Sequence, residues 1–330
     1  MVDWRWRILR VAVLAAMGAA LLHGCAAGER DGDVMPSLTE VDLVSGEKLK
    51  VVATTSIVAD VVSTIGGDHI DLTRLMPLGA DPHAFEPTPQ DAAAISGAHV
   101  VFVNGVDLEA FLDRLLANAG GDVPVVPVSE GIQLLAFEGD HGHDEEEGGT
   151  GDDHGEYDPH TWFDPANVQV WVGNIESALI ALDPVHAADY GVNARAYRAE
   201  LDALDAWIRE QVASIPQDRR ELVTDHSVFT YFAHAYGFEQ IGVITAGSST
   251  LSEPSAQELA ALQEVIAEHG VPAVFFSTTV NPRLAEQLAG DTGIQVVPLY
   301  TGSLSDADGP ADTYLAFMRY DVGRIVEALR

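Results

Sequence analysis

Short apolar runs alternate with longer amphipathic segments along this chain, and the alternation occurs twice. Runs of this length bounded by turn signals are typical of strands, and the amphipathic segments between them are typical of helices. The predicted strands cover residues 49–53, 72–76, 100–103 and 125–128 in the first half, and residues 222–224, 241–244, 273–276 and 295–299 in the second. Strands that alternate with helices form parallel sheets covered by helices. The sequence therefore predicts an α/β fold with two lobes, each a parallel sheet covered by helices.

A long helical stretch separates the two halves. One helix is predicted over residues 165–182, and Asp183 and Pro184 then resemble the N-cap and first position of a second helix, which Pro216 stops. About thirty helical residues span roughly 45 Å, which is long enough to bridge two lobes. We therefore predict a first lobe over residues 47–182, a rigid linking helix over residues 183–215 and a second lobe over residues 216–330.

The first residues resemble a targeting segment. Three arginines precede an apolar stretch over residues 11–22, which is too short for a comfortable transmembrane helix. The Leu-His-Gly-Cys sequence that ends at Cys25 resembles a bacterial lipobox with an unusual histidine, and the alternative is an ordinary signal peptide. We predict a signal peptide (1–24), lipidation of Cys25 and a flexible tether (25–46), which together make the protein extracytoplasmic and lipid-anchored to a membrane. Cys25 is the only cysteine, so the protein has no disulfide and no thiolate metal ligand.

The charge of the chain limits its partners. The formal net charge is −34, from 51 acidic and 17 basic residues. A negative field of this size argues against nucleic acid and against anionic substrates, and it raises the local concentration of cations. Over most of the surface, the acidic residues only aid the solubility of the protein.

Three widely separated histidines share one local pattern. His83 and His160 each follow an Asp-Pro dipeptide and precede an aromatic residue by two positions, and His226 directly follows Asp225. The prolines restrain the turns that hold the first two histidines. Each histidine falls after a predicted strand, where open α/β sheets place ligands. Because imidazole is the commonest protein ligand for transition metals, we predict that the three side chains converge on one divalent cation between the lobes.

This set of donors favours zinc. Three neutral imidazoles suit Zn²⁺, with water or a carboxylate in the fourth position, whereas Mn²⁺ prefers more oxygen ligands. Protons compete for imidazole, so the affinity should fall below about pH 6. Three histidines and a water also form catalytic zinc sites, so a zinc hydrolase or lyase is an alternative, and a surface adhesin that binds metal is a third. Because no His-Glu-x-x-His or Gly-x-Ser-x-Gly motif is present, we predict a binding protein and not an enzyme.

Residues 138–158 interrupt the alternation of strands and helices. They contain ten acidic residues, six glycines and three histidines, His141, His143 and His154, and almost nothing apolar. Such a composition cannot form a core, so we predict a mobile loop. Its histidines could collect zinc at low affinity and pass it inward, because a flexible chain holds them at a high local concentration. The alternative is a solvated run of charges with no specific role.

Five segments together resemble the substrate-binding lipoproteins of zinc and manganese ABC importers. They are residues 81–87, 158–164, 223–226, 253–255 and 314–320, and the resemblance extends over residues 49–330. It implies two α/β lobes, a rigid connecting helix, and a metal held between the lobes by His83, His160 and His226. It also implies an ABC permease with its ATPase as the partner. Manganese members tend to have glutamate at the third position and zinc members histidine, and zinc members often carry a His- and acid-rich loop.

One segment departs from the family pattern. Many members place an aspartate ligand in a Thr-Asp-Ser segment, and here Gly302 stands between Thr301 and Ser303. A glycine has no side chain with which to bind a metal, so the fourth ligand would be water, Asp306, Asp308 or Glu86. We expect a monomeric protein that delivers Zn²⁺ to a permease, with a manganese-specific protein of the same family as the alternative.

Overall fold

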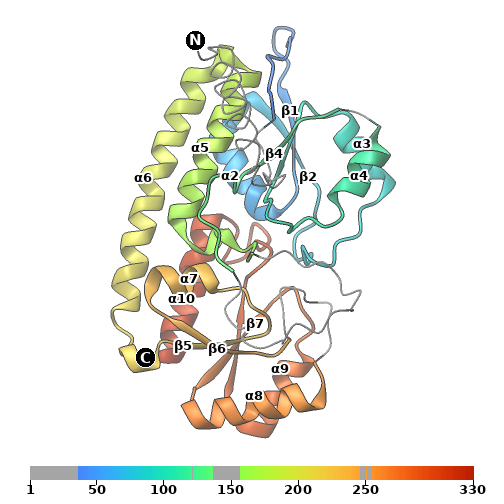
Figure 1. Cartoon of the computed structure of the whole chain (residues 1–330). Coiled ribbons are helices and arrows are strands. Elements are labelled where there is room, and N and C mark those ends of the chain that lie inside the picture. The colour runs from blue at the N-terminus through green and yellow to red at the C-terminus, as the bar shows by residue number, and fades with distance from the viewer. Residues whose placement is uncertain (1–35, 121, 137–156, 246–249, 251–253) are drawn as a thin grey trace, which may run out of the picture. The chain divides into compact units, whose positions relative to one another are not determined.

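The computed structural model describes residues 36–330 except residue 121 and the segments 137–156, 246–249 and 251–253 (Figure 1). The predicted signal peptide, Cys25 and the first part of the tether lie outside the described residues, as do His141, His143 and His154. The described chain forms two four-stranded sheets in which all paired strands are parallel. This confirms the α/β fold that the alternation of segments predicts.

The first sheet has the strand order β2-β1-β3-β4. Successive side chains point to two buried faces: Val51 and Phe102 join a core with α2 and α5, while Val52 and Val101 join a core with α3 and α4. Because both faces are covered, the strands appear in the sequence as continuous apolar runs. The elements of this lobe are β1 (Leu49–Ala53), α2 (Ser56–Gly66), β2 (Ile70–Arg74), α3 (Pro89–Ser96), β3 (Val100–Val103), α4 (Leu112–Ala119) and β4 (Val125–Pro127).

The second sheet repeats this plan with the order β6-β5-β7-β8. Phe275 faces a core that includes α7 and α10, and its neighbours Val274 and Phe276 face a core with α8 and α9. The elements are β5 (Glu221–Thr224), α7 (Thr230–Tyr236), β6 (Glu239–Val243), α8 (Ala256–His269), β7 (Ala273–Ser277), α9 (Arg283–Thr292), β8 (Gln295–Leu299) and α10 (Tyr314–Leu329).

Two long helices, α5 (Pro165–Leu182) and α6 (Ala187–Val212), connect the sheets. Helix α6 packs against α2 and α5 of the first lobe and against α10 of the second. Its buried residues recur at three- and four-residue steps, as in Leu201, Leu204 and Ile208. One apolar core therefore extends through α6 into both lobes.

Some elements begin later than the sequence predicts. Helix α4 begins at Leu112, after Val106 and Asp107, whose φ angles of 55° and 58° lie outside the helical region. Helix α10 begins at Tyr314, because the side chain of Thr313 accepts a hydrogen bond from the backbone of Ala316 and caps it. The linking helix begins after a short 3-10 turn, Pro184–His186.

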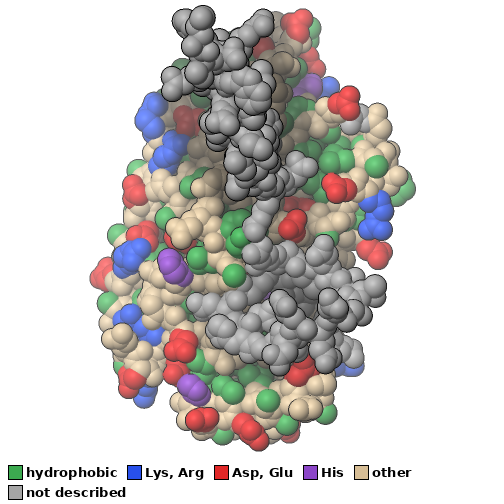
Figure 2. Space-filling model, in the orientation of Figure 1, with side chains coloured by type: hydrophobic (Ala, Val, Ile, Leu, Met, Phe, Trp, Pro, Cys, Tyr) green, Lys and Arg blue, Asp and Glu red, His purple; other side chains and the backbone are tan. Residues whose placement is uncertain are grey.

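The surface carries the excess of acidic residues. On the face shown in Figure 2, Asp and Glu side chains are scattered and do not gather in one patch. Within the described part of the chain, no helix has the length and apolar character that crossing a bilayer requires.

Candidate metal centre

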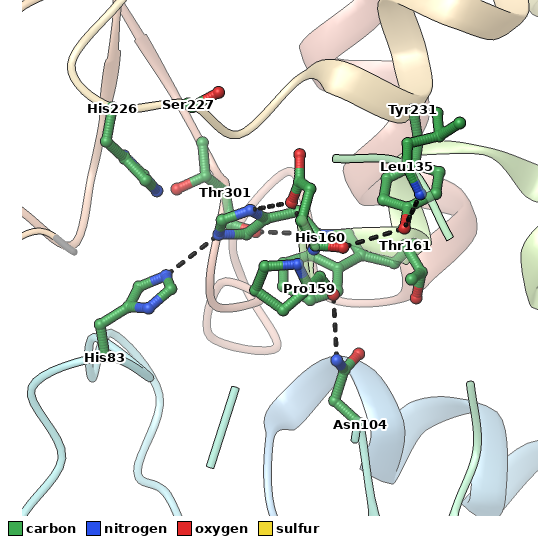
Figure 3. A network of polar contacts seen from close by, with 12 residues as sticks. His83, Asn104, Leu135, Pro159, His160, Thr161, His226, Ser227, Tyr231 and Thr301 are labelled. Carbon is green, nitrogen blue, oxygen red and sulfur yellow. Dashed lines mark hydrogen bonds and ion pairs between the residues drawn. The ribbon is translucent and has the colours of Figure 1, made fainter. Parts of the chain in front are cut away.

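Three histidine side chains from different loops meet at one point (Figure 3). His83 lies between β2 and α3, His160 lies between β4 and α5, and His226 follows β5. One ring nitrogen from each lies within 4.8 Å of the other two. The centroids of the three rings are 5.1, 5.3 and 5.6 Å apart. The structure thus brings together the three residues singled out by the sequence, and their binding of a metal stays a prediction.

The three rings differ in exposure. His160 and His226 are buried, with exposed fractions of 1 % and 3 %, whereas His83 is only partly buried. Two of the predicted ligands therefore lie in the interior of the protein, and the third lies nearest to solvent.

Each histidine is held by an aspartate close to it in sequence. Asp81 accepts the backbone N–H of His83 at 3.0 Å, and Asp158 accepts the backbone N–H of His160 at 2.8 Å. These two Asx turns explain why the Asp-Pro-His tripeptide occurs twice. The carboxylate of Asp158 also accepts a hydrogen bond from Nδ1 of His160, at 2.6 Å. A carboxylate on Nδ1 fixes the tautomer and leaves Nε2 able to bind a metal.

The second lobe makes an equivalent pair. Asp225 lies 3.1 Å from Nδ1 of His226 and accepts its backbone N–H at 3.0 Å. The other oxygen of this carboxylate accepts the backbone N–H of Ser277 from β7. In contrast, Oδ2 of Asp158 is buried without a hydrogen-bond partner among the described residues. Buried carboxylates next to the rings supply negative charge that a divalent cation would balance.

Burial and these carboxylates together shift the pKa values of the two buried histidines in opposite directions. Burial is the largest influence on His160 and lowers its pKa, although Asp158 opposes the shift. Burial also acts to lower the pKa of His226, but the carboxylate of Asp225, supported by Asp81 and Asp158, more than offsets it and the pKa is raised. Of the two buried rings, His226 therefore holds a proton more readily than His160.

Contacts between the lobes fix the loop that carries His160. The hydroxyl of Tyr231, from α7 of the second lobe, donates to the carbonyl of Asp158 at 2.9 Å. The indole N–H of Trp162 donates to the carbonyl of Thr301 at 3.0 Å. The first contact precedes His160 by two residues and the second follows it by two, so this ligand is anchored on both sides.

The donor set fits a small divalent cation. The Nε2 atoms of His83 and His160 lie 3.0 Å apart, and nitrogen ligands of a tetrahedral zinc ion are separated by roughly 3.3 Å. For this pair only a small adjustment is needed, while the three nitrogens as a group lie within 4.8 Å of one another. Because Asp158 holds the Nδ1 proton of His160, the proton between the two Nε2 atoms belongs to His83 and must leave when both bind an ion.

The three proposed carboxylate ligands do not join the cluster. Glu86, Asp306 and Asp308 are exposed, and the potential metal-binding group among the described residues contains only the three histidines. Asp306 lies in a turn that a hydrogen bond from the Gly309 N–H to its carbonyl closes, at the solvent-facing end of the segment. At Gly302, an added Cβ would lie 2.6 Å from Cδ of Pro82, so this segment passes the His83 loop too closely for any side chain.

The predicted collecting loop lies mostly outside the described residues, including His141, His143 and His154. Its two ends are described: Ala136 and Tyr157 form an antiparallel bridge, and the backbone N–H of Asp158 donates to the carbonyl of Leu135. The loop is thus inserted three residues before His160.

Some supporting residues were not predicted from the sequence. Tyr231 and Asn104 donate to backbone carbonyls next to His160, and the carbonyl of Thr301 accepts the indole N–H of Trp162. None of the supporting residues is near His160 in sequence, and no local pattern marks them. The aspartates before each histidine were visible, and their repeated spacing was the available signal.

The chain matches known proteins over most of its length. The family described as the zinc-uptake complex component A, periplasmic, matches residues 51–328. A manganese-binding lipoprotein of Halalkalibacterium halodurans is 35% identical over 285 residues, which are 86% of this chain and 89% of that protein. An iron ABC transporter substrate-binding lipoprotein of Streptococcus pyogenes serotype M1 is 33% identical over 300 residues, 89% of this chain and 93% of that protein.

The solved structures agree with this match. The periplasmic zinc-binding protein TroA of Treponema pallidum is 31% identical, with a TM-score of 0.76 over 86% of this chain and 99% of that chain. The three relatives are named for three different metals, so their names do not decide which metal this chain binds. Family membership confirms a binding protein and not an enzyme, and it confirms the extracytoplasmic location. The chain belongs to the zinc-uptake component A family, the metal-binding proteins of ABC transporters.

Proposed function

We propose that this protein binds Zn²⁺ through His83, His160 and His226 and delivers it to an ABC permease with its ATPase. The observation that carries the proposal is the set of donors: three imidazole nitrogens within 4.8 Å, with no carboxylate in the group among the described residues. Zinc accepts a tetrahedral site of nitrogen ligands, whereas manganese favours carboxylate and water oxygens.

The geometry supports binding and release without chemistry on a substrate. His160 and His226 are buried and held by Asp158 and Asp225, so these ligands are oriented before the metal arrives. His83 is the more exposed ligand, and Pro82 in its loop packs closely against Gly302 of the second lobe. A movement of that loop would remove one ligand and lower the affinity at the permease.

Manganese is the second candidate. A relative with 35% identity is named for manganese, and the buried carboxylates of Asp158 and Asp225 stand directly behind two of the rings. Binding manganese with high affinity would require additional oxygen ligands, which water would have to supply.

Competition between the two metals tests the choice. The wild-type protein should bind Zn²⁺ at least about 100-fold more tightly than Mn²⁺, because nitrogen donors favour the later metal. His226→Glu should reduce this ratio by replacing an imidazole with a carboxylate, and His226→Gln is the control that removes the ring without adding charge. Equal or tighter binding of Mn²⁺ by the wild-type protein would contradict the proposal.

Delivery to a permease is tested in the cell. Deletion of the gene should slow growth in zinc-depleted medium, and added zinc should restore it. A strain that instead recovers only with manganese would identify manganese as the cargo.

A Cys25→Ser variant tests the lipid anchor, because the protein should leave the membrane fraction while the purified binding domain keeps its zinc affinity.

The loop between Ala136 and Tyr157 is proposed to collect zinc. Because these two residues pair in an antiparallel bridge, an Asn-Gly turn can replace residues 137–156 with little disturbance of the flanking chain. Competition titration should then find one zinc equivalent in the deletion variant and further equivalents in the wild type. A variant with His141, His143 and His154 changed to glutamine keeps the loop and its charge as the control. Only one equivalent at micromolar affinity or better in the wild type would exclude collection.

A further inference from the structure

His160 occupies the centre of a three-residue turn. Its φ and ψ angles are −80° and 49°, and the backbone N–H of Thr161 donates to the carbonyl of Pro159 at 2.8 Å. Both features define an inverse γ-turn, whose central residue is set by the hydrogen bond between its neighbours. The direction of the imidazole therefore depends on where the carbonyl of Pro159 points.

A second donor fixes that carbonyl from another part of the lobe. The side-chain amide of Asn104, which follows β3, donates to the carbonyl of Pro159 at 3.0 Å (Figure 3). The same amide nitrogen donates to the carbonyl of Gly105 at 2.8 Å. Asn104 is fully buried, so bulk water does not compete with its amide for this carbonyl.

Asn104 is in turn held by a buried carboxylate. Glu109 accepts the backbone N–H groups of Asn104 and Gly105 at 2.7 and 3.1 Å, and the hydroxyl of Thr54 at 2.6 Å. Burial is the largest influence on this carboxyl group and raises its pKa to about 7. Water does not compete for these bonds in the interior.

The loop between Asn104 and Glu109 has an energetically unfavourable backbone conformation. Gly105, Val106 and Asp107 have consecutive φ angles of 80°, 55° and 58°. Two of these residues carry a Cβ, which disfavours left-handed backbone. Strained backbone persists where its surroundings force it, and such places concentrate at binding sites. Here the strain bends the chain so that Glu109 returns to the backbone of Asn104.

We propose that Asn104 is a positioning residue for metal binding: its amide fixes the Pro159 carbonyl and thereby the turn that aims His160 at the ion, while Glu109 holds Asn104 in place. This inference rests on the proposed metal site. It assigns to β3 and the loop after it a role in the affinity of a site that they do not touch.

The test compares two side-chain amides, one buried and one partly buried, that each donate to a backbone carbonyl. Asn104→Ala should weaken zinc binding about tenfold, the lower end of the effect of removing an outer partner of a metal ligand. It should also change the visible absorption spectrum of the Co²⁺-substituted protein, which reports the geometry of the ligands. Asn193→Ala removes a comparable amide, which donates to the carbonyl of Ile65 away from the site. This control should keep the zinc affinity within about twofold and leave the Co²⁺ spectrum unchanged.

The outcomes are distinguishable. Wild-type zinc affinity and an unchanged Co²⁺ spectrum in Asn104→Ala would overturn the inference, even if the variant unfolds at a lower temperature. Should that variant not fold, Glu109→Gln keeps the Asn104 side chain and removes the acceptor of the Gly105 N–H, and it should shift the spectrum with a smaller loss of affinity. An unchanged spectrum in this variant would also overturn the inference. If His160→Ala itself leaves zinc affinity unchanged, the proposed function fails, and this inference fails with it.

Discussion

Each lobe contributes one buried aspartate–histidine pair to the site, and the two pairs differ in charge. In the first lobe, Asp158 lies 2.6 Å from His160, and burial still lowers the pKa of that ring. In the second lobe, burial acts in the same direction on His226, but Asp225 and two further carboxylates outweigh it, so the pKa is raised. The same two residue types therefore give a neutral ligand in one lobe and a readily protonated ligand in the other.

The surroundings of the two carboxylates explain this difference. Burial acts to raise the pKa of Asp225, but His226 and the Ser277 bonds lower it overall. The lowered pKa of Asp225 and the raised pKa of His226 are the shifts that mutual attraction of opposite charges produces. Around His160, the neighbouring His226 adds a second positive charge that further lowers its pKa. Two imidazoles this close cannot both be protonated without cost, and the pKa is lowered for His160 and raised for His226.

Removal of either buried imidazole ring should have the largest effect on zinc affinity. His160→Ala and His226→Ala should each weaken zinc binding by more than about 100-fold, beyond the range for an outer partner, because each removes a direct ligand. Isothermal titration with a competing chelator measures both constants. His234→Ala, a histidine outside the cluster, is the control and should bind zinc as the wild type does. A loss below tenfold for His160→Ala would remove it from the set of direct ligands.

Substitution of Asp158 or Asp225 should have the second largest effect on zinc affinity. Asp158→Asn and Asp225→Asn should weaken zinc binding by about 10- to 100-fold, because each carboxylate orients its ring and increases its basicity. We expect the larger loss for Asp158, whose oxygen is closer to the ring nitrogen, at 2.6 Å against 3.1 Å. The same titration measures both. A larger loss for Asp225→Asn would show that the negative charge of Asp225 matters more for zinc affinity than the short hydrogen bond between Asp158 and His160.

Much of this comparison could be predicted from the sequence. The repeated Asp-Pro-His tripeptide and the aspartate before His226 are local patterns, and a parallel sheet brings the ends of its strands to one edge. The β-α alternation predicted both sheets, because strands buried on two faces are marked by apolar residues throughout. The strand at Val100–Val103, which is buried at every position, was predicted with its observed limits for this reason.

The remainder depends on contacts that a local pattern does not encode. Asn104 and Pro159 are 55 residues apart, and Tyr231 and Asp158 are 73 residues apart. The sequence also left the fourth ligand open between Glu86, Asp306, Asp308 and water. Among the described residues, the group of possible metal ligands contains the three histidines alone, and Glu86, Asp306 and Asp308 are exposed, so the identity of the fourth ligand stays a prediction.

The pH dependence of zinc binding should separate the two pairs. An imidazolium ion cannot bind a metal, so affinity should fall as the pH decreases through the pKa of the ring that protonates first. The raised pKa of His226 places this fall at a higher pH than an ordinary imidazole would, and His160, whose pKa is lowered, should not contribute until the solution is more acidic. Zinc titrations across a series of pH values measure the midpoint.

Asp225→Asn sharpens this prediction. Loss of the carboxylate removes the main influence that raises the pKa of His226, so the midpoint should move to lower pH even though the affinity at neutral pH is weaker. The matched variant is Asp158→Asn. It should move the midpoint less, because Asp158 is a lesser influence on His226. A midpoint that is equally low in both variants would show that the two pairs share one titration.

The smallest effect should come from the exposed carboxylates. Glu86→Gln, Asp306→Asn and Asp308→Asn should each keep the zinc affinity within about twofold, because solvent and salt screen charges at the surface. These side chains are exposed, and none belongs to the histidine group among the described residues. Titration at low and at moderate ionic strength measures the remaining long-range contribution, which should disappear with salt. A tenfold loss that persists in salt for one of them would identify it as a ligand that reaches the ion after its loop moves, and the zinc site would then contain a carboxylate from outside both aspartate–histidine pairs.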